Sequence, residues 1–127
     1  MLSFGAAVEK RFPPVQADDE SETRESLPTW VVCRACGARI TLSASAVAVQ
    51  GSHLHEFVNP SAVTFFVRCF STAPGCMPIG ERSKEWTWFP GYEWQIELCR
   101  ACTSHLGWSY HGQRRFYGLI RDAIAET

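Results

Sequence analysis

Residues 85–108 read EWTWFPGYEWQIELCRACTSHLGW, and most of the unusual chemistry of the chain lies in this segment. It contains a Pro90-Gly91 turn and a tight thiol pair at Cys99 and Cys102. It also contains four of the five tryptophans of the chain: Trp86, Trp88, Trp94 and Trp108. Each indole buries on the order of 150–250 Å² when it is covered. Aromatic side chains at this density therefore form either a hydrophobic core or the walls of a pocket.

The thiol pair has a counterpart near the start of the domain. Cys33-Arg34-Ala35-Cys36 and Cys99-Arg100-Ala101-Cys102 share the C-x-x-C spacing, which in a reducing compartment favours a metal over a disulfide. Four thiolates complete a tetrahedron around zinc and leave no position open for water or substrate. The sequence therefore predicts a structural Zn²⁺ bound by Cys33, Cys36, Cys99 and Cys102, with two redox dithiols or buried free cysteines as the alternatives. By analogy with zinc fingers, binding contributes on the order of 10 kcal/mol to folding.

The remaining cysteines and the histidines have simpler interpretations. We expect Cys69 and Cys76 to be buried as small apolar residues rather than to act as nucleophiles. His105 follows Cys102 closely, but four sulfurs already saturate a zinc ion, so packing or a backbone hydrogen bond is expected for it. His53 and His55 lie in a polar stretch and are predicted to face solvent.

Composition limits the possible classes of protein. With 127 residues, a net charge of -1 and a pI near 6.4, the chain fits one domain and has no basic surface for nucleic acid or anionic membranes. We find neither a signal peptide nor an apolar run of about 18 residues. We therefore expect a soluble, cytoplasmic protein that binds neither nucleic acid nor membrane. Residues 1–28 are predicted to be a flexible acidic tail, and residues 29–127 the folded domain.

The pattern of the folded part is mainly β, because no long stretch has a helical period. Residues 71–80 are predicted to be a loop, residues 43–50 are ambiguous, and a helix after residue 120 is left open. The predicted strands are residues 29–32, 38–42, 54–58, 62–70, 86–89, 92–98, 107–111 and 116–120.

Three of the indoles have spacings that can bring them together. Trp88 and Trp94 are six residues apart across the Pro90-Gly91 turn, and Trp108 follows Cys102 by six residues. If the turn reverses the chain and the metal holds Trp108 nearby, the three rings form three sides of a box. Taken alone, the spacing leaves both a box and a solid core open, because buried aromatic residues usually pack against one another.

The combined motifs resemble a known family. Trp88-Phe89-Pro90-Gly91-Tyr92-x-Trp94 followed by Cys99-x-x-Cys102-x-x-His105-x-Gly107-Trp108 is similar to the thalidomide-binding (CULT) domain of the cereblon family. Cys33-x-x-Cys36, Val58-Asn59-Pro60 and Phe116-Tyr117-Gly118-Leu119 extend the match to about residues 29–122. The resemblance implies a β-tent, in which two antiparallel sheets meet at a steep angle and are pinned by the four-cysteine zinc site. It also implies a small bacterial-type homologue made of this domain alone.

The resemblance further implies the ligand site. In the family, the residues matching Trp88, Trp94 and Trp108 enclose a cyclic imide such as glutarimide, and main-chain groups of those matching Trp86 and Trp88 read its polar edge. The positions of Asn59, Phe65 and Tyr110 complete the rim and one side. Animal members have histidine where this chain has Trp86 and Phe65, which places selectivity beyond the imide ring in doubt. No segment of the 127 residues matches the one that docks on a ubiquitin-ligase adaptor, so an adaptor is not expected.

The leading hypothesis is therefore a non-catalytic binding module for cyclic imides, including glutarimide, succinimide, hydantoin and uracil or uridine rings, and cyclic imides at protein termini. One alternative is a zinc-containing methionine sulfoxide reductase, which needs a reactive thiol for which Cys69 and Cys76 are the candidates. Another is an aromatic cage for methylated ammonium groups, to which Glu85, Glu93 and Glu97 could add charge.

Overall fold

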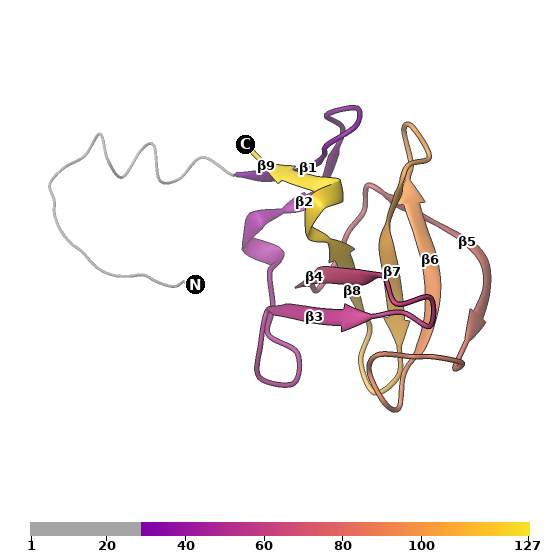
Figure 1. Cartoon of the computed structure of the whole chain (residues 1–127). Helices are drawn as coiled ribbons and strands as arrows, with labels where there is room; N and C mark the ends of the chain where they lie inside the picture. Colours follow the sequence, from indigo (N-terminus) through magenta and orange to yellow (C-terminus); the bar gives the residue numbers. More distant parts are fainter. Residues whose placement is uncertain (1–28) are drawn as a thin grey trace, which may run out of the picture.

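The computed structural model describes residues 29–127, which form two antiparallel β-sheets (Figure 1). The acidic tail predicted for residues 1–28 lies outside the described residues. In Figure 1 the strands β1 and β9 run across the direction of β6, β7 and β8, so the small sheet lies across one end of the large one. The mainly β class and the two-sheet architecture are confirmed. No helix in residues 29–127 has the length and apolar character needed to cross a membrane.

The large sheet has six strands in the order β3-β4-β8-β7-β6-β5. They are β3 (Leu54–Val58), β4 (Thr64–Phe70), β5 (Cys76–Ser83), β6 (Glu93–Cys99), β7 (His105–His111) and β8 (Phe116–Ile120). The small sheet has the order β2-β1-β9 and consists of β1 (Trp30–Cys33), β2 (Arg39–Leu42) and β9 (Ile124–Glu126). Two 3₁₀ turns, η1 (Ser43–Ser45) and η2 (Arg121–Ala123), connect the sheets.

Several predicted elements differ from the structure. The predicted loop 71–80 is wrong in its second half, because β5 begins at Cys76; Pro78 is tolerated there because β5 is an edge strand. Residues 86–89 form a turn instead of a strand, and Trp86 has a φ of 59°. The helix left open at the C-terminus is replaced by η2 and β9. The strands over 54–58 and 116–120 are confirmed with the predicted bounds.

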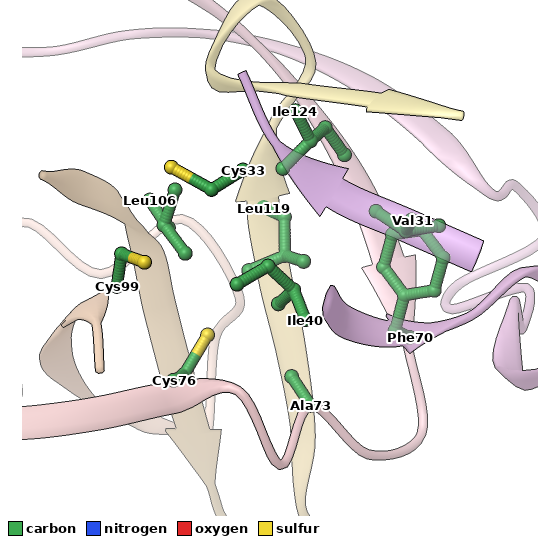
Figure 2. Packing of buried hydrophobic residues seen from close by; sticks show 10 residues of the cluster. All are labelled: Val31, Cys33, Ile40, Phe70, Ala73, Cys76, Cys99, Leu106, Leu119 and Ile124. Carbon is green, nitrogen blue, oxygen red and sulfur yellow. The ribbon is translucent and has the colours of Figure 1, made fainter. Parts of the chain in front are cut away.

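The hydrophobic core lies between the two sheets (Figure 2). Val31 of β1 and Ile124 of β9 pack from the small sheet against residues such as Phe70 and Leu119 of the large sheet. Cys33 and Cys99 belong to this cluster, so the core reaches the C-x-x-C turns. This packing fixes the small sheet against the large one on the face opposite the tryptophans.

A second apolar cluster supports the tryptophan-bearing face of the large sheet. It consists of Val49, Cys69, Phe89, Tyr110 and Phe116. Tyr110 of β7 pairs with both Trp94 of β6 and Phe116 of β8, and directly opposed residues share one face of a sheet. The indoles therefore rest on a layer of buried aromatic rings.

Candidate functional site

The four C-x-x-C cysteines come together at one end of the molecule. Their sulfur atoms all lie within 4.8 Å of one another, so the four side chains can hold a metal ion. The Sγ atoms of Cys33 and Cys102 are 3.7 Å apart, as are those of Cys36 and Cys99. A tetrahedron with Zn–S bonds of about 2.3 Å has edges of about 3.8 Å. The donor set and its spacing therefore fit Zn²⁺.

Each cysteine pair lies on a hydrogen-bonded turn. The Cys33 carbonyl accepts from the Gly37 N–H at 2.8 Å, and the Cys99 carbonyl accepts from the Thr103 N–H at 2.8 Å. Gly37 and Thr103 have φ values of 80° and 66°, the left-handed conformation that lets such a turn close. Hydrogen bonding with Ser104 lowers the pKa of Cys102 to about 6, which favours its thiolate form.

The arginines inside the two motifs attach the turns to neighbouring strands. The Arg34 guanidinium donates to the carbonyls of Asp122 and Ile124 at 3.0 and 2.8 Å. The Arg100 guanidinium donates to the Cys76 carbonyl at 2.8 Å. One motif thereby holds η2 and β9, and the other holds the start of β5.

The two remaining cysteines are enclosed. Cys69 is 0% exposed and Cys76 is 3% exposed. Burial raises the pKa of each thiol to about 12, which keeps it protonated at neutral pH. A nucleophilic cysteine needs the opposite environment, exposed and electropositive.

The tryptophan-bearing face carries a cavity of about 290 Å³. All seven residues predicted for the ligand site line it, together with Pro60 and His105: the predicted set is Asn59, Phe65, Trp86, Trp88, Trp94, Trp108 and Tyr110. The three indoles therefore surround space and do not form a solid core. Their role in binding stays a prediction.

Packing and hydrogen bonds fix the orientation of the indoles. The ring centroids of Trp88 and Trp108 lie 5.0 Å apart at 80°, in an edge-to-face arrangement. The Trp94 Nε1–H donates to the Glu85 carbonyl at 2.6 Å, and the Trp88 Nε1–H donates to the Val58 carbonyl at 3.4 Å. Both bonds engage main-chain carbonyls, so these indole N–H groups do not point freely into the cavity.

The turn over residues 84–89 leaves main-chain groups open beside the cavity. The main-chain N–H groups of Glu85, Thr87 and Phe89 donate to Ser83 Oγ, the Lys84 carbonyl and Thr87 Oγ1, respectively. The main-chain N–H and C=O groups of Trp86 and Trp88, in contrast, form no hydrogen bond with any residue of 29–127. Trp86 holds a left-handed φ of 59°, which is unusual for a bulky residue and typical of functional sites.

Asn59 holds the loop between β3 and β4. Its side-chain oxygen accepts from the main-chain N–H groups of Ser61 and Val63 at 3.0 and 2.9 Å. These bonds engage the oxygen, so the NH₂ group is the part of the Asn59 amide that can donate to a ligand. Phe65 follows on β4 and packs edge-to-face on Trp108 at 5.5 Å.

His105 is a cavity residue that the sequence interpretation missed. The predicted backbone hydrogen bond is present, because Nε2 donates to the Gly107 carbonyl at 3.0 Å. The ring also lies edge-to-face against Trp108 at 5.0 Å, and it lines the cavity. Burial lowers the pKa of His105, so the ring is neutral near pH 7 and its Nδ1 is an acceptor. Its position on the same strand as Trp108, shortly before that indole, was the available signal.

The expectation that His53 and His55 face solvent is wrong. Both are half-buried because the chain at residues 47–52 folds back over them and supplies acceptors. His53 Nδ1 donates to the Val47 carbonyl at 3.1 Å, and its Nε2 accepts from Arg68 Nε at 3.0 Å. His55 stacks on Phe57 with centroids 5.4 Å apart.

Comparison with known proteins agrees with this architecture. No family model matches the chain. The protein cereblon of Danio rerio is 36% identical over 77 residues, covering 56% of this chain and 18% of that protein. The protein cereblon of Xenopus tropicalis is 35% identical over 74 residues, covering 54% and 17%. That of Drosophila melanogaster is 32% identical over 107 residues, covering 76% and 18%.

The chain contains a cereblon-like CULT domain. The resemblance to the cereblon CULT domain, the fold class and the clustering of the four cysteines are thereby confirmed. The chain spans less than a fifth of the length of these cereblon relatives. The activity and partners of the full-length proteins therefore belong to those proteins, and for this chain they are proposals.

Proposed function

We propose that residues 29–127 form a non-catalytic binding module for cyclic imides. The ligand class comprises glutarimide, succinimide, hydantoin and uracil rings, including a cyclic imide at the end of a protein chain. The ring lies among Trp88, Trp94 and Trp108. The imide edge meets the main chain of Trp86 and Trp88.

The observation that carries this proposal is the set of unpaired main-chain groups beside the indoles. An imide edge presents an acceptor, a donor and a second acceptor in a row. The main chain of Trp86 and Trp88 offers both N–H and C=O groups with no partner among the described residues. Main-chain groups read such an edge without loss of side-chain entropy. Leaving a buried imide group unpaired costs roughly 1–3 kcal/mol, which is the source of selectivity.

The size and charge of the cavity agree with a small neutral ring. A volume of about 290 Å³ lies at the lower end of the range for ligand pockets. None of the nine lining residues is acidic or carries a fixed positive charge. Glu85, Glu93 and Glu97 do not line it, so a methylated ammonium group would lack a counter-charge. Because the atom count of the ligand bounds its affinity, we expect micromolar binding.

The same geometry disfavours a sulfoxide reductase. That chemistry needs a thiolate in the cavity, but the wall contains no cysteine. Cys69 and Cys76 are enclosed thiols of raised pKa. We therefore assign Cys69 and Cys76 to packing. The C-x-x-C cysteines are assigned to a structural Zn²⁺.

The proposal is tested by titrating the protein with glutarimide and with N-methylglutarimide. Quenching of tryptophan fluorescence and calorimetry both report binding. We expect micromolar affinity for glutarimide and at least a tenfold loss for the N-methyl compound, because methylation removes the donor of the imide edge. No response to millimolar glutarimide, or equal affinity for both compounds, would refute the proposal.

The fifth tryptophan provides a matched control. Trp30 lies on β1 of the small sheet and stacks with Arg39, away from the cavity. Trp108→Leu should weaken glutarimide binding at least fivefold, because it removes an aromatic wall that is worth about 1 kcal/mol beyond its area. Trp30→Leu should leave binding unchanged. Equal affinity in the two variants would show that the indole wall is not the binding surface.

A further inference from the structure

Trp86 carries the most exposed large apolar side chain of residues 29–127. The residue is 72% exposed, compared with 57% for Val58, which is the next in order. Trp86 also lines the cavity. Its indole therefore stands at the mouth of the cavity with most of its surface in solvent. A large apolar side chain is more stable when it is covered, so this exposure points to a role for the indole.

The nine residues that line the cavity differ in exposure according to their depth. Tyr110 is 1% exposed and forms the base. Five residues are half-buried and form the walls: Asn59, Phe65, Trp88, Trp94 and Trp108. The remaining three are exposed and form the rim: Pro60, Trp86 and His105. The cavity therefore opens to solvent between these three rim residues.

Trp86 is the rim residue whose side chain is free to rotate. The ring of Pro60 is fixed to the main chain. The His105 ring is held by its bond to the Gly107 carbonyl at 3.0 Å and by its edge-to-face contact with Trp108 at 5.0 Å. The Trp86 indole, in contrast, forms no hydrogen bond and no ring–ring contact with the other residues of 29–127, and exposed side chains change rotamer within nanoseconds.

The turn that carries Trp86 is anchored on both sides of this residue. The Glu85 carbonyl accepts from the Trp94 Nε1–H at 2.6 Å, and Phe89 is 0% exposed. These contacts fix the main chain of the turn beside the cavity. Rotation about the side-chain torsions of Trp86 therefore moves the indole relative to the mouth and leaves the main-chain groups in place.

We propose that the Trp86 indole is a lid that folds over a bound ring and closes the mouth of the cavity. This inference rests on the proposed function and adds a role for the Trp86 side chain to that of its main chain. The bound ring then has an indole over its outer side in addition to the three in the walls. Closure removes apolar surface of both the ring and Trp86 from water, which is the driving force for it. Without a ring in the cavity, the lid has no surface to cover and stays in solvent.

The solvent exposure of each indole tests the lid directly. The protein is labelled with 5-fluorotryptophan, and the fluorine resonance of Trp86 is identified by its absence in Trp86→Phe. The shift of a resonance between H₂O and D₂O reports the contact of that indole with solvent. On saturation with glutarimide, we expect this shift to fall by about half for Trp86, as when one face of the ring is covered. The shift of Trp30, on β1 of the small sheet, should not change.

An unchanged solvent shift of Trp86 in the glutarimide-saturated protein would overturn the lid and leave the proposed function intact. If calorimetry shows no binding of glutarimide to the wild type, the proposed function and the lid both fail. The two failures are therefore distinguishable in one titration.

Affinities of Trp86 variants provide a second measurement. Trp86→Ala keeps the Cβ but removes the lid, so it should raise the dissociation constant for glutarimide about fivefold. Trp86→Phe keeps one aromatic face and should lie between Trp86→Ala and the wild type. Unchanged affinity of Trp86→Ala would contradict the proposal. Trp86→Ala should still prefer glutarimide over N-methylglutarimide, and loss of this preference would show that the substitution acts through the main chain instead of a lid.

Leu42→Ala is the matched control for removal of an exposed apolar side chain. Leu42 is 37% exposed on β2 of the small sheet and does not line the cavity. Its variant should keep the dissociation constant for glutarimide within about twofold of the wild type. An equal loss of affinity in Leu42→Ala and Trp86→Ala would indicate a general effect on the fold and would overturn the assignment of the lid to Trp86.

Discussion

At the scale of single residues, His53 connects three parts of the fold. It donates to the Val47 carbonyl and accepts from Arg68, whose guanidinium also lies 3.6 Å from the Glu126 carboxylate. Glu126 belongs to β9, so this chain of contacts joins the large sheet to the small one. The link depends on a neutral imidazole, because a protonated ring cannot accept from Arg68.

Folding stability should therefore decrease as pH falls. Burial lowers the pKa of His53 in the folded protein, and the Arg68 charge adds to this effect, although Glu126 and the Val47 carbonyl oppose it. The unfolded chain, with a His pKa of about 6.5, then binds the proton more readily. The stability is present above pH 6.5 and is lost as pH falls toward the lower folded pKa.

Urea unfolding at pH 7.5 and pH 5.5 measures this loss. His53→Gln keeps an oxygen that can accept from Arg68 but does not titrate, so its stability should change less between the two pH values. Thiolate protonation at the metal site affects both proteins and cancels in the difference. Parallel pH profiles would contradict the assignment to His53.

For Tyr110 we predict a gain of stability when a polar group is removed. The Tyr110 side chain is buried, and its hydroxyl forms no hydrogen bond with the described residues, so removing it should not destabilise the ligand-free protein. We expect Tyr110→Phe to raise the free energy of unfolding by up to about 1 kcal/mol. Tyr117→Phe, which loses the bond from Arg115, should lower it by a similar amount. Urea denaturation checks both, and a destabilised Tyr110→Phe would show that the hydroxyl is paired in the folded state.

At the scale of secondary structure, local sequence patterns predicted the strands whose own residues favour an extended chain. Strands β3 and β8 have β-rich sequences bounded by turn residues, and their bounds were correct. Strand β5 was missed because its sequence, with Pro78 and Gly80, is typical of a loop. It is a strand because β6 pairs with it, through Cys76 opposite Cys99 and Ile79 opposite Ile96. Such pairing is a tertiary effect that local sequence does not encode.

The candidate site was likewise predicted only in part from the sequence. Spacing and resemblance placed the indoles, Asn59, Phe65 and Tyr110 around one cavity. They did not place His105 there, because its spacing from Cys102 indicates the metal site and does not reveal its contact with Trp108. The resemblance named the main-chain groups of Trp86 and Trp88, but residue patterns could not show that these groups lack hydrogen bonds, since this depends on the turn conformation in which Trp86 is left-handed.

Gly118 shows how strand packing shapes the cavity. It lies on β8 opposite Trp108, and a Cβ there would lie 2.7 Å from Val67 Cγ1 and 3.0 Å from Tyr110 Cε2. Gly118→Ala should therefore destabilise the fold by about 1–3 kcal/mol, as overpacking does. It should also weaken ring binding, because the Tyr110 ring must move. Urea denaturation and calorimetry measure the two effects.

Gly80 is the matched comparison for that variant. It lies on the exposed edge strand β5 with a φ of 77°, and a Cβ added there would meet no atom within 4 Å. Gly80→Ala should cost about 1 kcal/mol of backbone strain and leave ring affinity unchanged. If both variants retained wild-type affinity, the Tyr110 ring would not be part of the cavity wall.

At the scale of the whole molecule, the cysteine cluster joins the two sheets. One pair lies in the turn between β1 and β2 of the small sheet, and the other in the turn between β6 and β7 of the large sheet. Trp94 and Trp108 stand on β6 and β7, the two strands that leave the second turn. A metal ion bound here would fix the positions of β6 and β7, and therefore of the cavity walls that these strands carry.

Metal removal should therefore abolish both the fold and ring binding. A structural zinc contributes on the order of 10 kcal/mol, comparable with the whole stability of a domain of this size. We expect one zinc per chain by elemental analysis, and a strong chelator should collapse the β-sheet circular dichroism and the glutarimide response together. Cys36→Ser should behave like the chelated protein, because three thiolates leave the tetrahedron incomplete. Cys69→Ala, which changes a buried thiol outside the cluster, should retain one zinc per chain. A chelated protein that kept its sheets and still bound glutarimide would show that core packing alone holds the two sheets together.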